Sequence, residues 1–116
     1  MTENIDINSA GNTGSPVHVS EEWWLASLGR MIIWARLRER AAGTAEVHDS
    51  DGNTLVYDSV DTARAMLMDA DFVSHEGLDE DDALARGFSL EEIAPPEARD
   101  DEQLRARMVQ KLGERA

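Results

Sequence analysis

The chain has 116 residues, of which 24 are acidic and 11 are basic, so its formal net charge at pH 7 is −13. Hydrophobic residues make up 41% of it, enough for one folded domain with a modest core and too many for a disordered acidic chain. The absence of cysteine excludes disulfide scaffolds, zinc–thiolate sites and cysteine nucleophiles, and the negative charge argues against direct nucleic-acid binding, which depends on Lys and Arg neutralising phosphates.

The first segment, residues 1–19, is rich in Asn, Ser, Thr and Gly and offers little apolar surface to bury. We expect a disordered N-terminal tail there, a single acidic α+β domain over 20–113 and a frayed C-terminus over 114–116. The chain does not open with a basic region followed by an apolar stretch, and its most apolar part, 23–37, is short and contains two arginines. We therefore expect a cytoplasmic protein with no secretory signal and no membrane association.

Residues 20–29 are predicted to form a helix, with Ser20 as its N-cap and two glutamates in its first turn. Two structures fit the residues that follow. One continues the helix to Ala42, which leaves a second apolar face to be covered, for example by a second copy of the chain. The other ends the helix near Gly29 and makes 31–40 a strand, which gives the next hairpin a third strand. We favour the strand.

A hairpin follows, with strands near 44–49 and 54–58 on either side of an Asp-Gly turn. A two-residue turn would mix polar and apolar side chains on each face of this hairpin. A type I turn with Gly52 in a left-handed bulge position instead gives one apolar face, and we prefer it. This register pairs Val47 with Leu55 and Ala45 with Tyr57.

Three more helices are predicted after the hairpin, near 59–71, 79–86 and 100–112. Each begins at a residue type that caps helices, with acids in the first turn, and Gly87 marks the end of the second. In the last, apolar side chains recur every fourth residue, at 104, 108 and 112. The expected fold is α+β, a small antiparallel hairpin or meander packed with about four helices.

The negative charge is concentrated in one part of the chain, because residues 43–101 hold 17 acids and 3 bases. Many of these acids stand at predicted helix starts, where the helix dipole favours them. The remainder still makes an unusually negative surface, and one run within it is a candidate face for a basic partner. This candidate face consists of Glu76, Asp79, Glu80, Asp81 and Asp82.

No motif of known chemistry is present. The histidines lack zinc-binding spacing, and the chain has neither a phosphate-binding glycine loop nor a nucleophile elbow. The acids around the Asp-Gly turn lack the first ligand of a calcium loop, so we favour a turn over a metal site. We expect a protein that is not an enzyme and has no cofactor. A weak divalent-cation site is the further alternative, built on Asp49, Asp51, Asp58 and His75.

Trp23, Trp34, Arg36 and Arg38 form the candidate interaction surface, because protein interfaces are enriched in Trp and Arg. The competing interpretation is that the tryptophans fill the core of a protein with few other aromatic residues. We predict a protein–protein interaction or regulatory module that forms a homodimer or binds another protein. The alternative function is an acidic inhibitor, either a DNA mimic or an immunity-type neutraliser of a basic partner.

Overall fold

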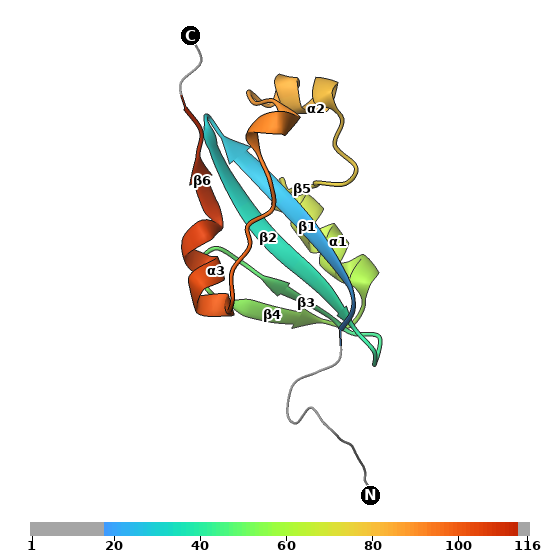
Figure 1. The fold of residues 1–116 in the computed structure, drawn as a ribbon. Coiled ribbons are helices and arrows are strands. Elements are labelled where there is room, and N and C mark those ends of the chain that lie inside the picture. Colours follow the sequence, from blue (N-terminus) through green and yellow to red (C-terminus); the bar gives the residue numbers. More distant parts are fainter. Residues whose placement is uncertain (1–17, 114–116) are drawn as a thin grey trace, which may run out of the picture.

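The computed structural model describes residues 18–113 as an antiparallel sheet of six strands with three α-helices, which is the α+β class expected (Figure 1). In chain order, the elements are β1 (His18–Leu28), β2 (Met31–Arg40), β3 (Ala45–His48), β4 (Thr54–Tyr57), α1 (Val60–Asp69), β5 (Val73–Ser74), α2 (Glu80–Ala85), the 3-10 helix η1 (Leu90–Glu92), α3 (Asp101–Arg107) and β6 (Val109–Lys111). Most of the predicted tail, and the predicted frayed end at 114–116, lie outside the described residues.

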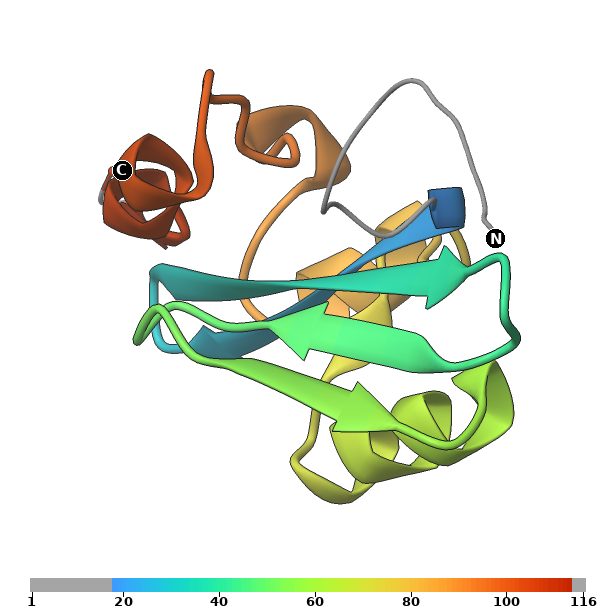
Figure 2. The same ribbon diagram turned by 90° about the horizontal axis from the view of Figure 1, so that it is seen from below.

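The central strand of the sheet is β2. One of its edges pairs with β1 over the full length of the strand. The other edge is shared, because β3 pairs with residues 36–39 and β6 pairs with residues 31–33. The strand order is β4-β3-β2-β1-β5, with β6 beside β2. Figure 2 shows α1 on one face of this sheet and α3 on the other, so both faces carry helical cover.

The predicted helix over 20–29 is wrong, since these residues form most of β1. Gly29, with φ of +62°, makes the tight turn that returns the chain as β2. Trp24 packs on the α1 face and Leu25 on the opposite face. Because both faces of the sheet are covered, β1 lacks the alternation of apolar and polar residues that marks a half-buried strand, and its apolar residues also fit a helical spacing.

The strand favoured over 31–40 is confirmed as β2, and the preferred hairpin register is confirmed as well. Val47 lies opposite Leu55 and Ala45 lies opposite Tyr57. Gly52 has φ of +87°, the left-handed conformation that the bulged turn requires.

Of the four predicted helices, α1 and α2 are close to their predicted bounds. The side chains of Ser59 and Asp79 cap them by accepting hydrogen bonds from backbone amides three residues further on. The last helix is shorter than predicted: α3 ends at Arg107, and β6 follows. The free edge of β2 explains the change, because its backbone groups pair with the chain from Met108 onward.

Two apolar cores lie on opposite faces of the sheet. The core on the α1 face contains Trp24, Ala35, Leu37, Ala45, Val47, Ala63 and Leu67. The core on the other face contains Leu25, Ile32, Trp34, Ala83, Phe88, Ile93, Leu104 and Met108. The second core fills only the part of its face nearest the β1–β2 turn. Charged side chains of β1, β2 and β3 occupy the rest of that face.

Candidate functional site

The face of the sheet opposite α1 carries two rows of side chains that run across three strands. Side chains that lie opposite one another in register project from the same face of a sheet. Trp23, Arg36 and His48 make one row, and Glu21, Arg38 and Glu46 make the next. The sheet therefore brings a tryptophan, two arginines and a histidine together from separate strands.

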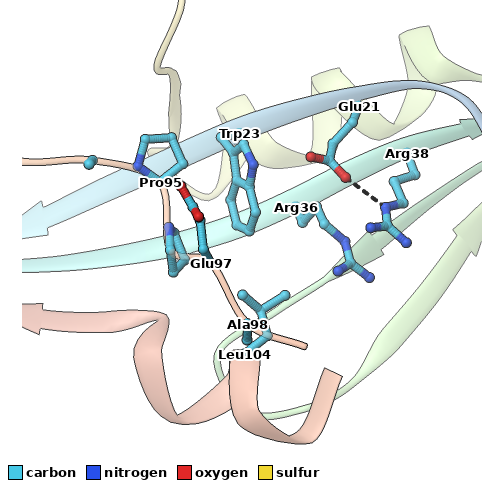
Figure 3. Close-up of a pocket in the computed structure, with 10 residues that line it drawn as sticks. Glu21, Trp23, Arg36, Arg38, Pro95, Glu97, Ala98 and Leu104 are labelled. Atoms are coloured by element: carbon cyan, nitrogen blue, oxygen red, sulfur yellow. Dashed lines mark hydrogen bonds and ion pairs between the residues drawn. The ribbon is translucent and has the colours of Figure 1, made fainter. Parts of the chain in front are cut away.

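A cleft of about 530 Å³ separates this face from the 94–98 segment, which connects η1 to α3 (Figure 3). Pro95 and Pro96 prevent this segment from pairing as a strand, because a proline lacks the N–H that pairing requires. The cleft is lined by Glu21, Trp23, Arg36, Arg38, Ala94, Pro95, Pro96, Glu97, Ala98 and Leu104. Its walls are thus a mixture of apolar and charged groups.

Arg36 is the most deeply buried charge of the cleft, with 5% of its surface exposed. Its Nη1 donates a hydrogen bond of 3.1 Å to Oδ1 of Asp101, in the first turn of α3. Its Nε is buried and has no hydrogen-bond partner among residues 18–113. The Nε of Arg40 on the same face is likewise buried without a partner in the described residues, but the side chain of Arg40 is 26% exposed. Arg36 is therefore the more costly of the two buried guanidinium groups.

Asp101 is the carboxylate that neutralises Arg36, and its side chain is 59% exposed. The hydrogen bond from Arg36 holds the pKa of Asp101 below its usual value, although partial burial opposes the shift. The charge of Arg36 lowers this pKa further, and that of Arg38 adds a smaller effect. The arginines of the sheet therefore favour the ionised carboxylate of Asp101.

The other arginines of this face are paired within the sheet. Nε of Arg38 donates to Glu21 at 2.8 Å, a contact drawn in Figure 3. Nη2 of Arg40 donates to Glu46, also at 2.8 Å. Burial raises the pKa of Glu46, but the hydrogen bonds and charges of Arg40 and His18 outweigh burial and hold this pKa below its usual value. Arg36 thus differs from its neighbours in taking its partner from outside the sheet.

His48 lies beside Arg36 and is 4% exposed. Its Nδ1 shares a hydrogen bond of 2.8 Å with Oγ1 of Thr54. Its Nε2 is buried, and no group in the described part of the chain bonds to it. A further unused polar atom therefore lies beside Arg36.

The structure brings three of the four predicted interaction residues, Trp23, Arg36 and Arg38, to one cleft. Trp34, the fourth, lies beneath them and is 0% exposed. Its ring packs edge to face against Trp23, with the ring centroids 6.0 Å apart. Trp34 is therefore a core residue that supports the floor of the cleft.

The remaining parts of the cleft were missed from the sequence. The 94–98 segment and Asp101 come from a part of the chain remote from β2, and their approach is a tertiary effect. The paired prolines were the one local signal, because they predict an extended segment. They do not indicate which surface that segment faces.

The predicted face for a basic partner is exposed, and two of its acids have structural roles. The side chain of Asp79 caps α2, and the carboxylate oxygens of Glu80 lie 3.4 Å from the backbone amide of Leu90. Glu76, Asp81 and Asp82 are also exposed. Binding of a basic partner at this face stays a prediction.

Of the acids proposed for a cation site, Asp49 bonds within the hairpin turn. Oδ1 of Asp49 accepts hydrogen bonds from the backbone amides of Asp51 and Asn53, at 2.9 and 3.0 Å. The ring of His75 packs against Trp34, with the centroids 5.4 Å apart. Within residues 18–113, no cluster of three or more His, Asp or Glu side chains could hold a metal ion.

No helix in the described part of the chain is long and apolar enough to cross a membrane. In comparisons with known proteins, the chain matches no family model, no curated protein and no solved structure. The geometry of the cleft is therefore the basis for a functional assignment. An open cleft with an aromatic wall, apolar prolines and a buried arginine is suited to binding an extended segment rather than enclosing a small molecule.

Proposed function

We propose that the protein is a non-enzymatic protein–protein interaction module and that the cleft between the sheet and the 94–98 segment binds an extended segment of its partner. The observation that carries this proposal is Arg36, a charged residue that lines the cleft although only 5% of its surface is exposed. Its one described side-chain partner, Asp101, belongs to α3 and not to the sheet. As expected from the sequence, the module acts in the cytoplasm, without a cofactor and without direct contact to nucleic acid or membrane.

The composition of the cleft supports this function. Trp and Arg are the residues most often found at the energetic centres of interfaces, and here Trp23 and Arg36 lie opposite each other on neighbouring strands. The prolines and Ala98 supply an apolar wall facing them. A segment in the cleft can therefore bury apolar side chains while its polar groups meet the arginines.

A peptide selection tests the proposal and does not require the partner to be identified. A random peptide library is selected against the full chain, and the selected peptides are measured against two variants. Ala94→Trp places a bulky ring at the exposed mouth of the cleft, whereas Ala65→Trp places the same ring on the exposed surface of α1, across the sheet. We expect A94W to weaken binding at least about tenfold and A65W to leave it unchanged. Equal binding to both variants, or a failure to select any peptide, would refute the proposed function.

Homodimer formation is the second candidate function, and it rests on another surface. Beyond the end of α1, the α1 face of the sheet carries an apolar patch that belongs to neither core. It consists of Ala26, Leu28, Met31, Ile33 and Val109. Two chains of charge −13 repel each other, so a contact between copies requires a patch without acids, and this patch has none.

Sedimentation equilibrium tests the dimer. Leu28, which is 69% exposed, is changed to Glu, and Leu84→Glu on α2 serves as the control because Leu84 is 49% exposed. We expect a dimer that L28E dissociates and L84E does not. A wild-type chain that stays monomeric at every concentration measured would exclude this second function.

A further inference from the structure

We infer that Asp101 occupies, within the chain, the position where a carboxylate of the partner segment binds, and that the partner's carboxylate replaces Asp101 on Arg36. The inference rests on the proposed function, because it takes the cleft as the binding site. It adds the chemical group that the site recognises. The partner is thus defined as a segment with an acidic side chain or a free C-terminal carboxylate beside apolar residues.

Arg36 requires a carboxylate in every state of the protein. A guanidinium charge on a residue that is only 5% exposed is expensive to leave unpaired. Within residues 18–113, Asp101 is the carboxylate that hydrogen-bonds to it. Any group that displaces Asp101 must therefore bring a negative charge of its own.

The side chain of Asp101 can be displaced from Arg36. Its side chain is 59% exposed, so it regains water contacts when it rotates away and loses little of its own solvation in doing so. Arg36 is fixed by contrast, because it stands on the central strand of the sheet with neighbours paired on both sides. The position on Arg36 that binds a carboxylate, called the carboxylate seat below, is therefore rigid. Asp101, which occupies this seat within the chain, is held loosely.

Asp101 also leaves much of the guanidinium unused. An arginine side chain offers five N–H donors, and Asp101 engages Nη1 alone. A carboxylate that takes the place of Asp101 can make a two-point contact through both Nη groups of Arg36, which Asp101 does not make.

The charges at the cleft limit the charge of the group that can replace Asp101. Arg36 and Arg38 are balanced by Glu21 and Glu97, and Asp101 adds one further negative charge against Arg36. Exchange of Asp101 for one carboxylate keeps this balance. A phosphate would bring more charge into a protein that is already at −13, so we assign the seat to a carboxylate.

Nuclear magnetic resonance of the ¹⁵N-labelled full chain tests this inference, with propionate as the carboxylate probe and propionamide as its neutral counterpart. The signals followed are Arg36 Nε–H and the Trp23 indole N–H. Asp101→Asn removes the internal negative charge that competes for Arg36. Glu102→Gln is the matched control, because it removes the same charge from the same turn and Glu102 makes no described contact with Arg36. Urea unfolding establishes that both variants fold.

We expect propionate to shift both signals and propionamide to shift neither. D101N should bind propionate up to about tenfold more tightly than E102Q, because an internal occupant lowers the apparent affinity by the fraction of molecules in which the seat is free. Equal affinities in the two variants, equal effects of propionate and propionamide, or tighter binding of phosphate than of propionate would each overturn the inference.

The two proposals can fail separately. If D101N shows no gain in affinity while the selected peptides still require an open cleft at Ala94, the carboxylate seat is wrong and the interaction site stands. If propionate binds as expected but the selected peptides bind A94W as tightly as the unchanged chain, the interaction site is wrong and the carboxylate seat stands. Amidating either the acidic side chain or the C-terminus of a selected peptide then identifies which carboxylate takes the seat.

Discussion

Arg36 and Asp101 form an ion pair of 3.1 Å that connects the central strand of the sheet to the first turn of α3. The two residues differ sharply in environment, because Arg36 is 5% exposed and the side chain of Asp101 is 59% exposed. The pair is therefore a contact between a fixed, buried cation and a solvated anion. Arg36 lines the cleft, and Leu104, three residues after Asp101, also lines it.

The first prediction concerns the acid sensitivity that this pair confers. Because Arg36 lowers the pKa of Asp101, the pair stabilises the fold above the unfolded pKa near 3.8, and this stability is lost as the pH falls through the lower pKa of the folded state. Solvent screening limits the contribution to about 1 kcal/mol or less. Between about pH 6 and about pH 2.5, the urea midpoint should therefore fall less in D101N than in the wild type. E102Q should keep the wild-type fall, and a D101N curve parallel to the wild type would contradict the prediction.

A second ion pair fixes α1 to β1. Glu22 receives hydrogen bonds from Arg64 and, at 3.0 Å, from Nε1 of Trp24. The bond from Arg64 lowers the pKa of Glu22, so its stabilisation is present above the unfolded pKa near 4.5 and lost as the pH falls through the folded pKa. Glu22→Gln should cost about 1 kcal/mol at neutral pH, after allowance for the partial exposure of Arg64.

Chemical denaturation at two pH values checks this second prediction. The difference between the wild type and E22Q should shrink as the pH falls through the lowered pKa of Glu22, because below it both chains carry an uncharged group at this position. Glu91→Gln removes the same charge at an exposed position and should change stability by less than about 0.5 kcal/mol. A cost of E22Q that persists unchanged in acid would show that packing, rather than the ion pair, accounts for it.

Trp23, which lines the cleft, and Trp34, which lies beneath it, should differ in the stability that they lose on replacement by phenylalanine. Trp34 is 0% exposed, so Trp34→Phe leaves a cavity and should destabilise the fold by about 2 kcal/mol. The loss is moderated because the indole Nε1 of Trp34 has no hydrogen-bond partner among the described residues. Trp23→Phe should cost less than about 1 kcal/mol and should instead weaken peptide binding. Equal losses of stability in the two variants, measured by denaturant unfolding, would argue against this division of roles.

The acidic run at the start of α2 contains acids that bond to the backbone and acids that are only exposed, and the two kinds should contribute differently to stability. The side chain of Asp79 accepts a hydrogen bond from the backbone amide of Asp82, and Asp79→Ala should cost about 1 kcal/mol. Asp81→Ala removes the same charge from the same run and should cost about half as much or less. Thermal unfolding of the two variants measures the difference. If both lose the same stability, the cap contributes nothing beyond its charge.

Local signals predicted much of the fold. The Asp-Gly turn and its pattern of apolar residues determined the hairpin register, because only one register places Val47 and Leu55 on the same face. The starts of α1 and α2 followed from the capping residues Ser59 and Asp79. These features depend on residues within a few positions of one another, which is why a single sequence reveals them.

The failures share one physical cause, which is that distant segments decide the outcome. The residues 20–29 form a strand instead of the predicted helix because β2 pairs with them along their whole length, and the end of the last predicted helix became β6 because β2 had a free edge. The candidate site followed the same pattern. Trp23, Arg36 and Arg38 were identified from composition, whereas Asp101 was not, because nothing near it in the sequence indicates Arg36.

Trp23 and Trp24 provide the most direct test of the cleft as the binding site, because they are consecutive residues on opposite faces of β1. Trp23 lines the cleft, and Trp24 packs beneath α1. The measurement is a titration of the ¹⁵N-labelled chain with a selected peptide, followed at the two indole N–H signals. Binding in the cleft predicts a large shift of the Trp23 signal and little change at Trp24. A larger shift at Trp24, or saturation of the protein with no shift at Trp23, would contradict the assignment of the cleft.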